Sequence, residues 1–262
     1  MNRWKVKTEV KIVAVMLLLA TVSGCRKAQS GVEIVTIQSG GTVEIEMIRL
    51  PGGKFFMGSE RGIELERPVH EVNVKPFAIG KFEVTQRQWK AVMGGSNPSK
   101  FTDGDDLPVE NVSWDDAQSF LKRLGNGYRL PTESEWEFAA RGGTLTVFFH
   151  EEKQGKTGEY AWFIGNAEER THQVGKKLPN PYGIFDIYGN VGEWCDDDWH
   201  DSYLGAPVDG RSWVDEPRAL QRAARGGSFR FDEISCRSAD RGRNFPNFRS
   251  PDGGFRLAKT LP

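Results

Sequence analysis

The sequence predicts an α+β fold in one irregular, loop-rich domain. Three segments in the first half of the chain begin with a helix-starting pattern, and each is followed by glycine. The second half contains short aromatic segments and turn residues without helical periodicity. Because helices are confined to the first half instead of alternating with strands along the chain, the α+β class is favoured over a series of β-α units.

The composition is that of an ordinary globular protein. The chain has 262 residues, of which 38% are hydrophobic and 27% charged, and its net charge is −1. This length suits one large domain or two small ones. A net charge close to zero argues against a nucleic-acid partner, because binding to phosphates requires a basic surface.

The first 24 residues are predicted to be a lipoprotein signal peptide. Basic residues precede an apolar run at 12–22, which is too short to span a bilayer. The run ends in Val-Ser-Gly followed by Cys25, as in a bacterial lipobox. We expect Cys25 to be lipidated and to anchor the protein outside the cytoplasm. Arg26 would favour the outer membrane in a Gram-negative host. A plain secretory signal or an uncleaved anchor is the alternative.

Residues 25–41 are polar and are predicted to tether the lipid to a domain at 42–262. The domain begins with strands, because apolar and polar residues alternate at 43–48 and again at 69–74. Between them, a Pro-Gly-Gly turn leads into a third strand at 54–59. The remainder of the domain carries the predicted helices and the loops.

Each predicted helix starts with a capping box. A Ser or Thr hydroxyl can accept from the amide three residues on, while the Gln, Asp or Glu at that position reaches back. The predicted helices run from Thr85 to Met93, from Ser113 to Gly125 and from Thr132 to Gly142.

Six motifs occur in order along the domain, and a signature follows them near the C-terminus. The motifs are P-G-G-x-F-x-M-G-S from Pro51, F-E-V-T from Phe82, P-V-x-x-V-S-W from Pro108, Y-R-L-P-T-E-x-E-W-E from Tyr128, P-Y-G from Pro181 and G-N-V-x-E-W from Gly189. The signature is R-G-G-S-F from Arg225, C-R-S-A from Cys236 and G-G-F-R-L from Gly253. Together they resemble the formylglycine-generating enzyme (sulfatase-modifying factor) family over roughly residues 42–258. The resemblance implies an irregular, loop-rich fold of the C-type-lectin kind.

The resemblance also implies a chemistry from which this chain departs. Oxidases of that family hold copper with two cysteines five residues apart and oxidise a substrate cysteine. Cys236 matches the second cysteine and Ser228 the active-site serine, but Phe231 occupies the first cysteine position. Gly192 and Ser235 also replace aromatic residues. A single thiolate is a poor copper(I) site, so bound copper is not expected.

The role of Cys236 has three interpretations. It could form a disulfide with Cys195, since the protein is expected in an oxidising compartment, and the resemblance indicates a subgroup in which these two cysteines occur together. It could be a free structural thiol. It could also be a catalytic thiol activated by Arg237, Arg241 or Arg243, which are close in sequence. The disulfide is the favoured prediction.

The resemblance further implies two calcium sites. Calcium prefers oxygen ligands from carboxylates and carbonyls. The first site would use the side chains of Asp186 and Glu193 with the carbonyls of Gly189 and Val191, and the second would use Asn166 and Ala167. The alternative for the first site is a turn with solvated acids.

Other polar and aromatic groups predict structure instead of chemistry. The acidic run 196–201 lacks the spacing of a calcium loop, so a solvated loop is expected. The four histidines have no ligand spacing, which disfavours a histidine-bound iron or zinc enzyme. Arg225 and Arg256 are expected to tie loops together through several hydrogen bonds. Trp114, Trp136 and Trp194 are expected to anchor the core.

Two functional classes therefore remain. The first is a lipid-anchored, non-catalytic binding or structural protein of the cell envelope with a protein or peptide partner. The second is an oxidase or maturation enzyme that converts a protein cysteine or another side chain, with Cys236 and Ser228 at its site. The replacement of a copper-binding cysteine by Phe231 favours the first class.

Overall fold

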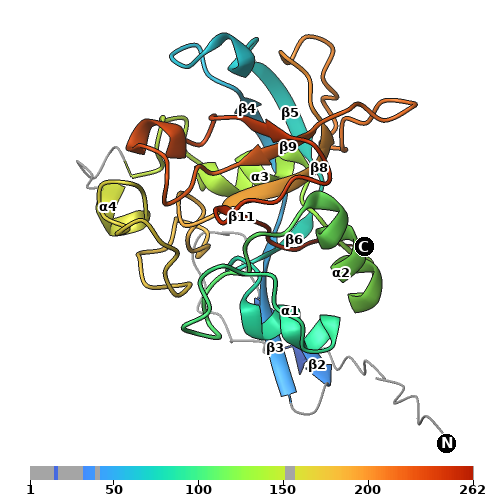
Figure 1. Cartoon of the computed structure of the whole chain (residues 1–262). Helices are drawn as coiled ribbons and strands as arrows, with labels where there is room; N and C mark the ends of the chain where they lie inside the picture. Colours follow the sequence, from blue (N-terminus) through green and yellow to red (C-terminus); the bar gives the residue numbers. More distant parts are fainter. Residues whose placement is uncertain (1–14, 17–31, 39–41, 151–156, 262) are drawn as a thin grey trace, which may run out of the picture.

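The computed structural model describes residues 15–16, 32–38, 42–150 and 157–261 (Figure 1). The predicted lipidation site, Cys25, and nearly all of the predicted signal peptide lie outside these residues. Among the described residues, none forms a helix long and apolar enough to cross a membrane.

The three predicted helices are confirmed, together with their capping boxes. They are α1 (Gln86–Met93), α2 (Trp114–Leu124) and α3 (Glu133–Arg141). The hydroxyls of Thr85, Ser113 and Thr132 accept the predicted amide hydrogen bonds. Each helix is followed directly by a glycine with positive φ, a conformation that glycine adopts without a steric penalty. A fourth helix, α4 (Thr157–Tyr160), is a single turn.

The largest sheet has six strands in the order β1-β2-β3-β6-β12-β7, all antiparallel. They are β1 (Val15–Met16), β2 (Val32–Gln38), β3 (Thr42–Leu50), β6 (Phe77–Gly80), β12 (Ala258–Thr260) and β7 (Tyr128–Arg129). The tether prediction is therefore wrong for Val32–Gln38, which pairs with β3 along its whole length. Its β-branched residues favour an extended strand, a preference that its overall polarity hid.

A second sheet, in the order β10-β9-β8-β11, is built entirely from the second half of the chain. Its strands are β8 (Gly192–Asp198), β9 (Arg222–Arg225), β10 (Gly242–Asn244) and β11 (Gly253–Gly254). The strands predicted at 54–59 and 69–74 are present as β4 (Gly53–Met57) and β5 (His70–Val74), and they pair with each other in a separate hairpin. Two 3-10 turns, η1 (Glu64–Glu66) and η3 (Glu233–Cys236), lie in the connections. Figure 1 shows the β4–β5 hairpin at one end of the molecule and β2–β3 at the other.

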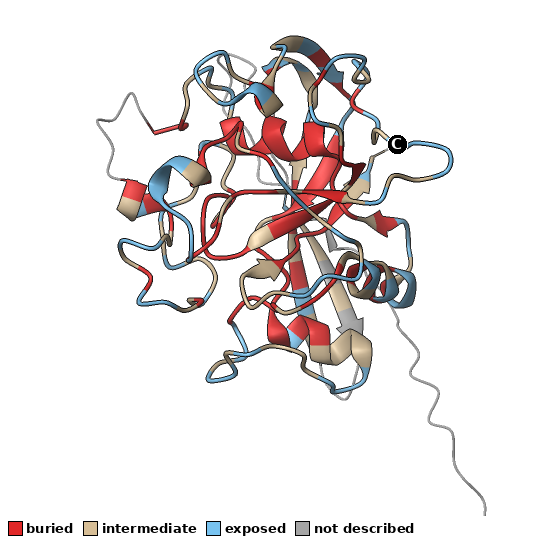
Figure 2. Cartoon of the chain, turned by 45° about the horizontal axis from the view of Figure 1, so that its top comes forward, coloured by how far each residue is buried: buried red, intermediate tan, exposed pale blue. Residues whose placement is uncertain are grey.

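Helix α3 is the centre of the fold. All nine of its residues are buried, and it contacts β4, β5, β8 and β9 (Figure 2). Trp136 on this helix is fully buried and Trp194 on β8 nearly so, which confirms their predicted role as core anchors. Trp114 is only partly buried, and its indole nitrogen donates to the carbonyl of Cys195.

Buried arginines tie the C-terminal segment to α3. Arg225 and Arg241 both pair with Glu133, and Arg225 also pairs with Glu137. Although burial alone would raise the pKa of Glu133, Arg241 and Arg225 hold that pKa below its usual value. Arg256 binds both oxygens of Glu193 at 2.5 and 2.6 Å. The predicted architectural role of Arg225 and Arg256 is thus confirmed.

The acidic run 196–201 differs from the predicted solvated loop. Asp197 and Asp198 are buried on β8. Asp198 pairs with Arg218 and Arg222, and Asp197 accepts from the backbone amides of Glu133 and Trp213. The partners that make this burial favourable come from distant parts of the chain, so local sequence could not reveal them.

Candidate functional site

The C-terminal segment forms a pocket of about 520 Å³ over the β8–β9–β10 sheet. One wall comes from residues 224–235 and the other from residues 240–253. Trp194 and Val112 contribute side chains from deeper in the fold. The pocket is therefore built by the segment that carries the C-terminal signature.

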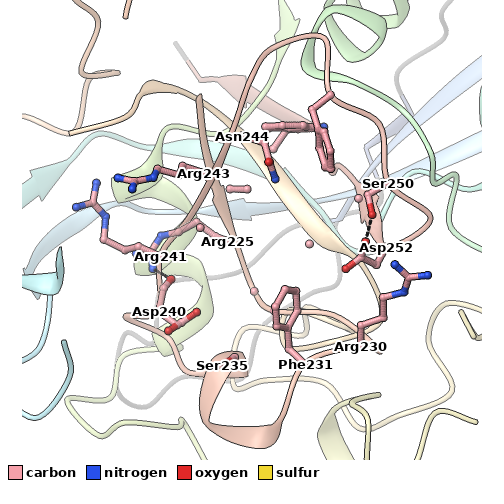
Figure 3. A pocket seen from close by; sticks show the side chains of 18 of the residues that line it. Arg225, Arg230, Phe231, Ser235, Asp240, Arg241, Arg243, Asn244, Ser250 and Asp252 are labelled. Atoms are coloured by element: carbon pink, nitrogen blue, oxygen red, sulfur yellow. Dashed lines mark hydrogen bonds between the residues drawn. The ribbon is translucent and has the colours of Figure 1, made fainter. Parts of the chain in front are cut away.

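The two rims carry different side chains. Figure 3 shows Arg230 and Phe231 on one rim, with Arg243 and Asn244 across the pocket from them. Phe231 is 50% exposed and Phe248, which also lines the pocket, is 43% exposed. The pocket thus offers aromatic and cationic groups to solvent.

Cys236 does not reach this pocket. It is fully buried at the end of η3, and its thiol donates to the carbonyl of Asp232 at 3.5 Å. Gly227 stands directly over it, because a Cβ placed on Gly227 would lie 2.7 Å from the Cys236 sulfur. The glycine that the signature requires is explained by this close approach.

The charge around Cys236 opposes a reactive thiolate. Burial, and then Asp240 and Asp232, raise the pKa of the Cys236 thiol to about 12. Arg237 and Arg241, two of the candidate activating groups, are paired with Glu66 and Glu133 instead. Their proximity in sequence therefore does not become an activating contact.

The predicted disulfide is not present in the structure, where Cys195 and Cys236 are both free, buried thiols. Cys195 lies on β8, while the sulfur of Cys236 is directed to Asp232 and packs at Gly227. Burial, together with Glu133 and Asp197, raises the pKa of Cys195. Of the three interpretations, the free structural thiol is the one that the structure contains.

Ser228 is fully buried below the pocket. Its hydroxyl donates to Asp252 at 2.9 Å and accepts from the backbone amide of Arg230 at 3.2 Å. Asp252 also accepts from the hydroxyl of Ser250 (Figure 3). Ser228 therefore connects the two walls of the pocket, and its hydrogen-bonding capacity is used within the protein.

The first predicted calcium site coincides with a buried cluster of charge. Asp186, Glu193 and Glu83 are fully buried and face a single guanidinium, that of Arg256. Burial, followed by the charges of Asp186 and Glu193, raises the pKa of Glu83 well above its usual value. The cluster thus carries more potential negative charge than positive charge.

The residues of this cluster fit a cation only in part. Asp186 Oδ1 is buried and lacks a hydrogen-bond partner. Glu193 is already satisfied by Arg256 and by the indole of Trp136. Within the described residues, no three His, Cys, Asp or Glu side chains form a metal-binding group. A calcium ion here would depend on Asp186 and on backbone carbonyls such as those predicted for Gly189 and Val191.

The second predicted site, Asn166 and Ala167, forms a hydrogen-bonded turn. The Asn166 side chain accepts from the amide of Phe163 and donates to the carbonyl of Ala161. The Ala167 carbonyl accepts from the amide of Arg170. These contacts explain the two residues without an ion.

Three charged groups at or beside the pocket were not singled out in the sequence: Arg230, Asp252 and Glu110. Glu110 is fully buried near Asp252, and one of its oxygens has no hydrogen-bond partner. Burial raises its pKa to about 7 despite hydrogen bonds from the amides of Phe101 and Lys100. These residues come from separate segments with no shared motif, so only the fold could bring them together.

The fold and the signature define a class of protein. Residues 37–261 match the sulfatase-modifying factor enzyme 1-like domain, and the chain belongs to that family. This finding confirms the resemblance and the α+β, loop-rich fold.

Similar proteins differ in the activities that their names give. The chain is 28% identical to the chaperone protein LppX of Paenibacillus barcinonensis, over 89% of this chain and 96% of that one. It is 30% identical to the formylglycine-generating enzyme of Thermomonospora curvata, over 81% and 92% of the two chains. Among solved structures, Treponema denticola variable protein 1 superposes with a TM-score of 0.75 at 31% identity, covering 86% of this chain and 98% of that one.

Proposed function

We propose that this protein is a lipid-anchored, extracytoplasmic binding protein of the cell envelope, and that its C-terminal pocket binds a protein or peptide partner without catalysis. One observation carries the proposal. At the position where an oxidase of the family would present a copper-binding cysteine, Phe231 is half exposed in the pocket.

The state of Cys236 supports the same proposal. An oxidase needs thiolates that copper and substrate can reach. Here the sulfur is buried beneath Gly227, and burial raises the pKa of the thiol. An exposed aromatic ring beside a buried, protonated thiol suits recognition better than oxidation.

The names of the relatives fit a binding role as well as an enzymatic one. The match to the relative named as a chaperone spans 96% of that relative's length. A relative named as an enzyme matches with similar identity. The family alone therefore does not decide the function, and the pocket residues carry the argument.

A turnover assay tests the absence of catalysis. The purified protein, supplied with copper and oxygen, should not convert a cysteine-containing sulfatase peptide to an aldehyde, as measured by mass spectrometry. Phe231→Cys supplies the missing thiol, so aldehyde formation by this variant would show that Phe231 alone blocks the reaction. Aldehyde formation by the wild type, lost in Cys236→Ser, would instead establish the oxidase.

The anchor is tested separately. Cys25→Ser should move the protein from the membrane fraction to the soluble fraction, because the lipobox-like sequence ends at this residue. A wild-type protein that is already soluble, with an N-terminus other than Cys25, would contradict the anchor.

Calcium is proposed as a structural ion held by Asp186. A cation that binds the folded state raises its melting temperature, by roughly 2–4 °C for each kcal/mol. Chelation should therefore lower the melting temperature of the wild type and leave that of Asp186→Asn unchanged. Asp103→Asn, an exposed acid, is the matched control and should respond to chelation as the wild type does. An unchanged wild-type melting curve would refute the site.

A further inference from the structure

The charged side chains that line the pocket differ in whether they form an ion pair. Four arginines and two aspartates line it. Arg225, Arg241 and Arg243 are paired with Glu133, Glu133 and Asp201, respectively. Arg230 is exposed, and among the described residues no carboxylate pairs with it. Its guanidinium lies 5.5 Å from the centre of the Phe229 ring.

The two acids of the pocket are already engaged. Asp240 pairs with Arg237 at 3.1 Å. Asp252 accepts hydrogen bonds from Ser228 and Ser250. Both acids are half-buried, whereas the exposed charged residues of the lining are Arg230 and Arg243. A ligand entering the pocket therefore meets positive charge, although the whole chain has a net charge of −1.

Two exposed aromatic side chains line the pocket, and two further exposed apolar side chains are close to them in the sequence. Phe231 and Phe248 line the pocket, and Ile234 and Phe245 are exposed beside them in the sequence. Isolated exposed apolar residues are ordinary, but several in one short segment mark an interaction site. Aromatic and arginine side chains are also the groups that most often dominate the binding energy of protein interfaces.

From this charge distribution we infer that the pocket binds an acidic peptide segment, in which an aromatic side chain packs against Phe231 and Phe248 and a flanking carboxylate pairs with Arg230. The inference rests on the binding function proposed above and adds the chemistry of the partner. Two exposed arginines are too few for a nucleic-acid surface, which needs a larger basic patch.

Three peptides of equal length test this chemistry by fluorescence anisotropy. The first carries a phenylalanine between aspartates, the second a phenylalanine between lysines, and the third a serine between aspartates. The first should bind the wild-type protein at least about tenfold more tightly than either other peptide, because each loses one contact type worth about a factor of ten. Added salt should weaken its binding.

A charge reversal identifies the residue. Arg230→Glu should lose at least about tenfold in affinity for the aspartate peptide and should gain affinity for the lysine peptide. Arg123→Glu, an exposed arginine on α2 away from the pocket, makes the same change in net charge and should leave both affinities unchanged. If Arg230→Glu only disturbed the structure of the pocket, it would lower the affinity for both peptides instead of lowering one and raising the other.

The outcomes separate the inference from the proposed function. If the lysine peptide binds as well as the peptide with phenylalanine between aspartates, and Phe231→Ala abolishes that binding, the pocket binds peptides but the acidic chemistry is wrong. If no peptide of any charge binds, both the inference and the peptide-binding function are refuted.

Discussion

Phe231 and Cys236 are five positions apart, yet only one of them reaches the pocket. Phe231 is half exposed there, while Cys236 is buried behind the backbone of Gly227. The 3-10 turn η3, which has Asp232 as its N-cap, separates the two residues and ends at Cys236. At the scale of single residues, this chain therefore has an exposed phenylalanine at the first cysteine position and a buried cysteine at the second.

Gly227→Ala should destabilise the protein by roughly 1–3 kcal/mol. The new Cβ would lie 2.6 Å from the Ser235 carbonyl oxygen and 2.7 Å from the Cys236 sulfur. Gly205→Ala is the matched control, because Gly205 also has a positive φ but a Cβ there would have no neighbouring atom within 4 Å. Urea denaturation should show a larger loss for Gly227→Ala, and equal losses would mean that the contact with Cys236 is unimportant.

Glu110 should make stability depend on pH. Burial raises its pKa to about 7 in the folded state, above the unfolded value of 4.5. Between these values the folded protein retains a proton that the unfolded chain releases, so stability falls as pH rises from about 4.5 to about 7. Glu110→Gln should remove up to about 3 kcal/mol of this change in denaturation measurements at pH 5 and pH 8. Parallel curves for the two proteins would contradict the shifted pKa.

Helix α3 is buried along its whole length and contacts β4, β5, β8 and β9. Its glutamates hold arginines from β9 and from the segment that leads into β10, and this keeps the pocket walls in place. The helix itself was predictable from its capping box and its following glycine. Its complete burial was not, because five of its nine residues are charged or hydroxylated and their partners lie in distant segments.

Glu137→Ala should destabilise the protein by about 3–5 kcal/mol, because it leaves buried arginine charge uncompensated. Glu137 pairs with Arg141 and Arg225 and accepts from the amide of Gly58. Glu71→Ala is the control, since Glu71 forms an exposed pair with Lys54 that contributes about 1 kcal/mol or less. Chemical denaturation measures both, and a small effect of Glu137→Ala would show that the buried network is dispensable.

At the scale of the whole molecule, sequence reasoning succeeded where information is local or where motifs recur in order. Capping boxes located three helices, alternation located β3 and β5, the Pro-Gly-Gly turn located β4, and the collinear motifs identified the family. It failed where the determinants are distant contacts. The buried pairs of Asp198 with Arg218 and Arg222 and the free state of Cys195 and Cys236 depend on packing between separate segments. The strand at Val32–Gln38 is a different case, because it pairs with the neighbouring strand β3 and was hidden by the polar residues around it.

The candidate site shows the same contrast between local sequence information and contacts between separate segments. Phe231, Ser228 and Cys236, which the signature singled out, lie in or beneath the same pocket wall. Side-chain exposure decided which of them faces the pocket. Arg230 and Asp252 carry no motif, so their roles emerge only when the two walls of the pocket are brought together.

Substitutions of the exposed pocket residues should leave the stability of the fold nearly unchanged. Arg230 and Phe231 are exposed and are not part of the buried arginine network, so Arg230→Ala and Phe231→Ala should each change the free energy of unfolding by no more than about 0.5 kcal/mol. Arg237→Ala, which removes the buried partner of Glu66 only a few residues further along, should cost about 3–5 kcal/mol. Denaturation of the three variants measures this contrast. A large loss in either surface variant would mean that the pocket residues hold the fold together and are not free to serve recognition.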